Sequence, residues 1–154
     1  MDVRELSDDD CRLAHAAMRE LRPQVGDEPA FVERVRSQFA QGYRLIGAFD
    51  GEHEHAVSVA GFRIDEKLAW GRHVYIDDLS TLPEGRGRGG ATALLRWIDA
   101  LAAAEGIVEV HLVARQPFAL NLQFLGLELD EFLAQFLPGE GVAPEGLLVE
   151  AVVG

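Results

Sequence analysis

Two groups of residues able to act on a ligand stand close together between positions 76 and 91. Four glycines fall within six residues, at 85, 87, 89 and 90, with arginines between them and a helical pattern directly after them. Glycine lets the backbone approach a ligand closely, and the first turn of a helix carries unpaired N–H groups at its positive end. These features predict an anion site suited to a pyrophosphate, to which Arg86 and Arg88 add positive charge.

Just upstream of the glycines, Asp77 and Asp78 form an acidic pair. A carboxylate can take a proton from an ammonium group, often through water, or anchor a cation. Because side chains alternate across a strand, we expect the two to point to opposite faces, with Asp77 as the favoured base and Asp78 free to cap a neighbouring element. The alternative, that both only make hydrogen bonds within the fold, carries about equal weight.

Two other phosphate-binding turns fit these glycines less well. A Walker loop requires Gly-Lys followed by Ser or Thr, and the turn contains no Lys. A dinucleotide fingerprint requires Gly-x-Gly-x-x-Gly and an acidic residue at the end of the next strand. Here the third glycine comes one place early, and the segment 107–113 ends without a carboxylate. A turn with a purely structural role is the remaining alternative.

The segments that position these residues alternate between helical and extended patterns. After a strand at 2–6, Ser7 is expected to cap a helix with three aspartates in its first turn and Pro23 at its end. The later elements are expected in this order: helix 29–41, strands 43–49 and 56–64 joined by an acidic tip, strand 73–80 after a turn at 65–66, helix 87–104, strand 107–113, short helix 117–125, strand 128–136 and strand 147–153. The strands 73–80 and 107–113 should lie side by side and parallel, since a helix connects them.

The stretch Arg86-Gly87-Arg88-Gly89-Gly90-Ala91 matches the Arg/Gln-x-x-Gly-x-Gly/Ala motif and, with the strand before it and the helix after it, resembles the GNAT superfamily of N-acetyltransferases. The resemblance extends over about residues 3–112. It implies an α/β (α+β) fold with a mixed, mostly antiparallel central sheet, helices on both faces and one parallel, splayed strand pair. A chain of 154 residues accommodates one such domain over 1–154.

The resemblance also implies an activity, which is transfer of an acetyl group from acetyl-coenzyme A to a primary amine of a small molecule or protein. The backbone of Leu79, Ser80 and Thr81 would pair with the pantetheine arm, and a backbone N–H near Leu79 would stabilise the oxyanion. The N–H groups of residues 87–92 would hold the pyrophosphate. The residues expected to bind the cofactor are therefore Leu79, Ser80, Thr81, Arg86, Gly87, Arg88, Gly89, Gly90, Ala91 and Thr92.

The segment after Val113 departs from the family. Many members place a tyrosine after the last parallel strand to protonate the departing sulfur, and the corresponding position here is Phe124. A thiol with a pKa of about 8.5 can leave unassisted near neutral pH, at some loss of rate. A second reading follows, in which the chain is a non-catalytic acyl-coenzyme A binding or protein-interaction module of the same fold.

The composition of the chain indicates which kinds of partner to expect. A formal net charge of −12 argues against binding to nucleic acid or an anionic membrane and is compatible with a cationic amine substrate. Cys11 is the only cysteine, and His53 and His55 alternate with carboxylates on a hairpin tip, where a solvated turn is favoured over a metal site. With no signal-like N-terminus, we expect the cytoplasm. The apolar strand 147–153 would pair with its own sheet or, in a homodimer, with a second copy.

Overall fold

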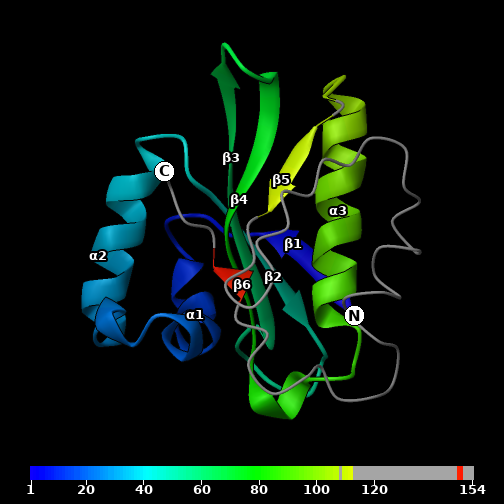
Figure 1. Ribbon diagram of the computed structural model, residues 1–154. Coiled ribbons are helices and arrows are strands. Elements are labelled where there is room, and N and C mark those ends of the chain that lie inside the picture. The colour runs from blue at the N-terminus through cyan, green and yellow to red at the C-terminus, as the bar shows by residue number, and fades with distance from the viewer. Residues whose placement is uncertain (108, 113–148, 151–154) are drawn as a thin grey trace.

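A computed structural model of the protein describes residues 1–107, 109–112 and 149–150. Its strands form one sheet in the order β1-β2-β3-β4-β5, with β6 also on β4 (Figure 1). The strands are β1 (Asp2–Glu5), β2 (Arg44–Phe49), β3 (Ser58–Lys67), β4 (Gly71–Thr81), β5 (Val110–Leu112) and β6 (Val149–Glu150). The first four pair antiparallel, and β4 pairs parallel with β5. This confirms the predicted mostly antiparallel sheet with one parallel pair.

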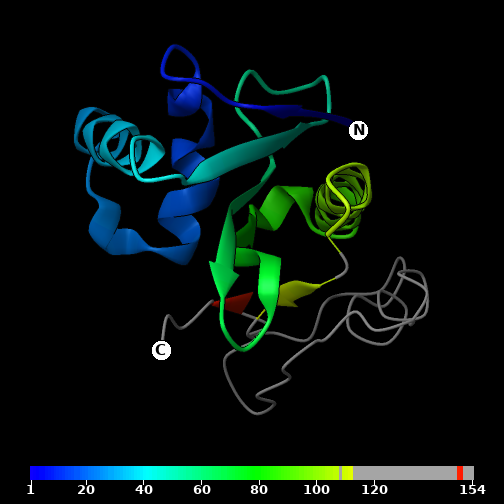
Figure 2. The same cartoon turned by 90° about the horizontal axis from the view of Figure 1, so that it is seen from above.

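Helices cover both faces of the sheet, as predicted (Figures 1 and 2). The α-helices are α1 (His15–Leu21), α2 (Glu28–Phe39) and α3 (Gly90–Ala104), and short 3-10 helices span Cys11–Ala14, Pro23–Val25 and Pro83–Gly85. One apolar core lies between the sheet and α3, and a second lies between the opposite face and α1 and α2. No helix among the described residues is both long and apolar enough to cross a bilayer.

The first helical region begins later than its sequence predicted. Residues 8–10 form a turn, and a 3-10 helix precedes α1. Ser7 does not cap the helix; instead the Ser7 backbone N–H donates to the Asp10 carboxylate at 2.6 Å. Aspartate favours such local bonds over the helix interior, which explains the delay. The predicted inward residues Leu13, Ala17, Met18 and Leu21 are nevertheless all buried.

The second half of the sheet also differs in its bounds. β3 continues to Lys67, and β4 begins at Gly71. The turn between them therefore lies at residues 68–70, beyond the predicted position at 65–66. The strand predicted at 107–113 is limited to β5 among the residues described. The elements predicted at 117–125 and 128–136 lie outside the described residues, whereas β6 falls inside the strand predicted at 147–153 and pairs antiparallel with β4.

One extra residue interrupts the pairing of β3 with β4. Gly61 stands opposite Asp78, but the next residue of β3, Phe62, stands opposite Ile76. Asp77 is thus left over on β4, which is the arrangement of a β-bulge.

The bulge changes the direction in which the acidic side chains point. After it, Leu79 lies in the core beneath α3, while the Ser80 hydroxyl donates to a backbone carbonyl of α1 at 2.7 Å on the opposite face. Asp78, two residues from Ser80 and bonded to groups of the same helical side, shares that face. Asp77 lies there as well, because Arg63 donates both to Asp77 (2.8 Å) and to a glutamine of α2 (2.9 Å). The prediction that the two aspartates face opposite sides is therefore wrong.

We expect the contact between α3 and the sheet to dominate the stability of the fold. Ile98 is 1% exposed in the core beneath α3, so Ile98→Ala should lower the free energy of unfolding by about 2–5 kcal/mol. Asp99→Ala, on the exposed side of the same helix, is the matched control and should change it by less than about 0.5 kcal/mol. Urea denaturation of both variants measures this, and equal losses would contradict the assignment of the core.

Candidate functional site

The glycine-rich turn adopts the backbone conformation for which glycine is needed. Gly87 has a φ of 75° and Gly89, the residue that precedes α3, a φ of 80°. A side chain in this left-handed region costs roughly 1–2 kcal/mol. A Cβ atom built at either position meets nothing within 4 Å. Conformation, and not crowding by described residues, is therefore what calls for glycine at these two positions.

Gly90 is needed for a different reason, which is close packing. A Cβ atom at Gly90 would lie 2.3 Å from Ser58 Oγ and 2.9 Å from Ser58 Cβ on β3. Ser58 itself is buried, and its hydroxyl lies 2.8 Å from Thr81 Oγ1 on β4. The start of α3 is therefore seated directly on the sheet, which fixes where its N–H groups point.

The first turn of α3 presents backbone N–H groups. The first hydrogen bond of the helix runs from the Ala93 N–H to the Gly89 carbonyl at 2.9 Å, and no side chain of the described part of the chain caps this end. A helix start of this kind carries partial positive charge and binds anions. The turn and this helix start bring together the predicted pyrophosphate-binding residues Arg86, Gly87, Arg88, Gly89, Gly90, Ala91 and Thr92.

Both arginines of the turn already have acidic partners. Arg86 lies 3.7 Å from a carboxylate oxygen of Glu20 on α1. Arg88 lies 3.3 Å from Asp50 and 3.2 Å from Glu52 in the connection between β2 and β3. Sequence reasoning missed these partners, because nothing in their spacing links them to residues 86–88.

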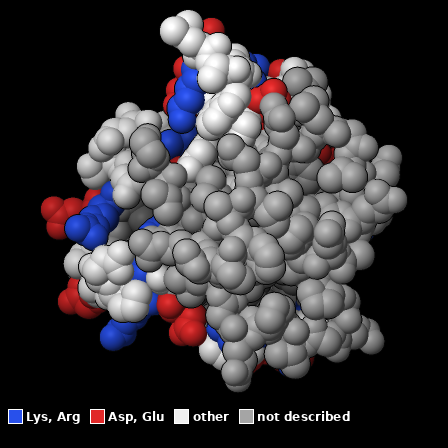
Figure 3. Space-filling view, viewed as in Figure 1, with Lys and Arg blue, Asp and Glu red and all other residues white. Residues whose placement is uncertain are grey.

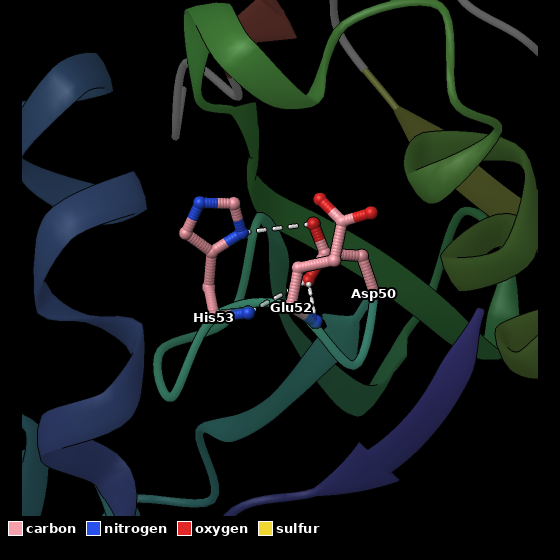
Figure 4. A group of neighbouring side chains, drawn as sticks. All are labelled: Asp50, Glu52 and His53. Carbon is pink, nitrogen blue, oxygen red and sulfur yellow. Dashed lines mark hydrogen bonds and ion pairs between the residues drawn. The ribbon is translucent and has the colours of Figure 1, made fainter.

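The connection between β2 and β3 is ordered by Asp50. Its carboxylate accepts the N–H groups of Glu52 (2.9 Å) and His53 (3.1 Å) and faces the His53 ring at 2.9 Å (Figure 4). Burial acts to raise the pKa of Asp50, but these hydrogen bonds lower it to about 2. One side-chain oxygen or nitrogen from each of the three residues lies within 4.8 Å of the others. Arg88 is the cation that contacts this group, so ion pairs join the connection between β2 and β3 to the glycine turn.

Next to the turn, the described pairing of the parallel strands is short. β5 pairs with β4 from Val74 to Ile76, and β4 continues to Thr81. Residues 113–148 lie outside the described part of the chain, so the parting of the two strands that the resemblance implied stays a prediction. β6 pairs with Asp78 and Leu79 on this part of β4, so a ligand that pairs with the backbone of Leu79 would have to share or displace that contact.

The two aspartates form a charged cluster beneath the bulge. The Asp78 carboxylate accepts hydrogen bonds from Arg22 Nε at 2.5 Å and from the Tyr43 hydroxyl at 2.8 Å. The Asp77 carboxylate accepts one from Arg63 Nε at 2.8 Å. Sequence reasoning missed these three partners, which come from distant parts of the chain.

The environment of Asp77 favours its uptake of a proton. Burial raises the pKa of the Asp77 carboxyl above its ordinary value, Arg63 lowers it in part, and the negative charge of Asp78 raises it. A raised pKa brings a carboxylate closer to what general-base catalysis near neutral pH requires. The position of the missing tyrosine, Phe124, lies outside the described residues.

Comparison with known proteins agrees with this geometry. The model of the acetyltransferase (GNAT) family matches residues 11–122, whereas no curated protein matches the sequence. An acetyltransferase from Trypanosoma brucei has a similar structure (TM-score 0.64, 16% identity, 82% of this chain and 98% of that one). So do a ribosomal-protein-alanine N-acetyltransferase from Brucella melitensis (0.63, 16%, 100% and 99%) and a Clostridium acetobutylicum acetyltransferase with acetyl-CoA (0.57, 20%, 84% and 97%). At these identities the likeness shows the fold.

The close packing of α3 against the sheet can be tested by a double-mutant cycle of Gly90 and Ser58. Gly90→Ala should lower the free energy of unfolding by about 1–3 kcal/mol, because its methyl group collides with Ser58. In a Ser58→Gly background the same substitution should be neutral or stabilising, since alanine is the better helix former. Thermal and urea unfolding of the four proteins measures the coupling. Equal effects of Gly90→Ala in both backgrounds would show that Ser58 is not the obstacle.

Proposed function

This chain belongs to the acetyltransferase (GNAT) family, and we propose that it transfers the acetyl group of acetyl-coenzyme A to a primary amine of a small molecule or a protein. One observation carries the proposal: the helix start that follows the glycine turn has no side-chain cap among the described residues and lies at the end of β4, the strand that carries the acidic pair. An anion bound there would leave a ligand arm free to run along β4 toward the acidic pair.

The residues present fit acetyl-coenzyme A. Gly87 and Gly89 carry no side chain that would keep a diphosphate from the N–H groups of α3. The Ser80 and Thr81 side chains bond within the fold, so they would contribute backbone groups to the pantetheine arm. The cofactor supplies an activated acetyl thioester when bound.

Proton transfer would come from the acidic pair. We assign Asp77 as the base that takes a proton from the ammonium group of the acceptor, directly or through one water. The neutral nitrogen would then form a bond to the acetyl carbon while the carbon–sulfur bond breaks, and the second proton that the nitrogen gives up on becoming an amide would pass through solvent to the departing thiolate. A backbone N–H near Leu79 would stabilise the oxyanion.

The acceptor is expected to be a cation. A formal net charge of −12 favours approach of a polyamine, an amino sugar or a lysine side chain over that of an anion. The Brucella protein of the same fold is named for an alanine of a ribosomal protein, which makes a protein amino group a further candidate.

A second candidate function is acyl-coenzyme A binding without transfer. Two observations favour it: each aspartate already has an arginine partner, and β6 lies on the edge of β4 at Leu79. Stabilisation by acetyl-coenzyme A without thiol release across a panel of amines would support this candidate over the enzyme.

The cofactor site is tested by replacing Gly89, with Gly106 as a control position of similar backbone conformation. Gly89→Leu should abolish stabilisation by acetyl-coenzyme A, because the side chain would fill the open turn. Gly106→Leu, at the other end of α3 with a similar φ (69°) and equally open space, is the matched control. At a ligand concentration of about 100 Kd, wild type and control should gain about 2.7 kcal/mol, a rise in Tm of about 5–11 °C. An undiminished rise in Gly89→Leu would contradict the placement.

The role of the base is tested by thiol release. Asp77→Asn should reduce kcat about 10²- to 10⁴-fold with each amine that the wild type accepts. Stabilisation by acetyl-coenzyme A should not change, because Asp77 lies away from the turn at 87–92. Full turnover by Asp77→Asn would remove Asp77 from the mechanism.

A further inference from the structure

We infer that the two neighbouring aspartates have different roles: Asp78 is a positioning residue, fixed by Tyr43 and Arg22, that holds its negative charge beside Asp77. This inference rests on the proposed function, in which Asp77 takes the proton of the amine. It also assigns Tyr43 and Arg22 a part in the site that no motif indicated.

The contacts of Asp78 hold its carboxylate in one orientation. One carboxylate oxygen accepts from Arg22 Nε and the other from the Tyr43 hydroxyl, and the side chain is 11% exposed. Both partners are donors, which match the two acceptor oxygens of a carboxylate. The carboxylate is therefore fixed in place from two sides.

Tyr43 is a permanent donor in this arrangement. The residue is buried, and burial together with the charge of Asp78 keeps the pKa of the Tyr43 phenol well above its ordinary value. The hydroxyl thus keeps its proton throughout the pH range in which the protein is expected to work.

A glycine makes the contact between Tyr43 and Asp78 sterically feasible. Gly61 stands opposite Asp78 in the pairing of β3 with β4, and a Cβ atom there would lie 1.7 Å from the Tyr43 hydroxyl oxygen. The tyrosine ring therefore crosses β3 where there is no side chain. The contact joins three neighbouring parts of the sheet at the bulge that aligns the aspartates.

Asp77 is held less completely. Its described hydrogen bond reaches one oxygen, Oδ2, from an arginine that also donates to Gln38 and Gln41. Within the described part of the chain, its Oδ1 oxygen accepts no hydrogen bond, which leaves an atom able to receive a proton. The charged and titratable groups that face Asp77 are Arg63 from β3, Asp78 and Tyr75 from β4, Arg22 after α1 and Tyr43 before β2.

These contacts predict how the pKa of Asp77 depends on the charge of Asp78. A fixed negative charge on the adjacent residue disfavours the charged form of Asp77 and so raises its pKa. Removing that charge while keeping the shape should lower the pKa of Asp77. If the charge of Asp78 has no influence on Asp77, the titration of Asp77 will stay where it is.

The test is an NMR titration of the full chain labelled with ¹³C-aspartate, with Asp77 assigned from the spectrum of Asp77→Asn. In the wild type, the Asp77 carboxyl carbon should titrate above the ordinary aspartate value of about 3.9. In Asp78→Asn its midpoint should move to lower pH. Asp65→Asn, an exposed aspartate on β3, removes the same formal charge elsewhere and should leave it unchanged. An unmoved midpoint in Asp78→Asn overturns the inference.

Tyr43→Phe tests positioning if Asp78→Asn does not fold. It keeps both carboxylates and the ring but removes the hydroxyl, so backbone amides at residues 77–79 should exchange with deuterium about tenfold faster. Unchanged exchange would overturn the inference.

Turnover then separates this inference from the proposed function. The acid limb of kcat/KM should move to lower pH in Asp78→Asn, whereas Asp77→Asn should lose turnover at every pH. Loss of turnover in Asp78→Asn with full turnover in Asp77→Asn would reverse the two roles. If acetyl-coenzyme A does not stabilise the wild type, the proposed function fails, and the carboxyl titration still decides whether Asp78 acts on Asp77.

Discussion

The extra residue in β4 is the constraint on which the site depends. Before the bulge, Val74 and Ile76 face α3, and after it Leu79 does. Strict alternation would have turned Asp78 toward that apolar core, where an unpaired carboxylate is costly. The bulge instead places two consecutive carboxylates on the face that α1 and α2 cover, directly after the stretch of β4 that pairs with β5. One change of register thus creates the acidic cluster and sets its place on β4.

The same bulge links elements that are distant in sequence. Arg22 follows α1 and reaches Asp78 across 56 residues, while Tyr43 precedes β2 and reaches it across 35. Removing one partner of a buried charge pair leaves the other uncompensated, which costs far more than the intact pair contributes. The packing of α1 on the sheet and the orientation of the aspartates therefore depend on each other. The buried cluster around the aspartates both connects α1 to the sheet and is the candidate centre for proton transfer.

The sequence predicted the parts of the fold that local pattern controls. The glycine turn, the apolar face of α3 and the parallel pair could be recognised because each depends on neighbours in the chain. The start of α3 was placed at residue 87 and lies at Gly90, since Gly87 and Gly89 adopt left-handed conformations that a helix excludes. The bulge left no sign in the alternation of residue types. Gly61 offered a signal, because a glycine within a strand often marks a close approach, but its partner Tyr43 could be found only from the fold.

The anion site proposed at the glycine turn would act through its backbone more than through its arginines. Arg86 and Arg88 each lie beside carboxylates, so their charge is largely balanced before a ligand arrives. The visible surface beside α2 likewise interleaves acidic and basic side chains rather than separating them (Figure 3). At the turn, the described group that no side chain compensates is the row of N–H dipoles at the start of α3, held by the contact of Gly90 with Ser58. Under the proposed function, a protein of net charge −12 would attract a diphosphate at this point because aligned dipoles act over a short range. Selectivity for the anion would then follow from the shape of the turn and not from the overall charge of the molecule.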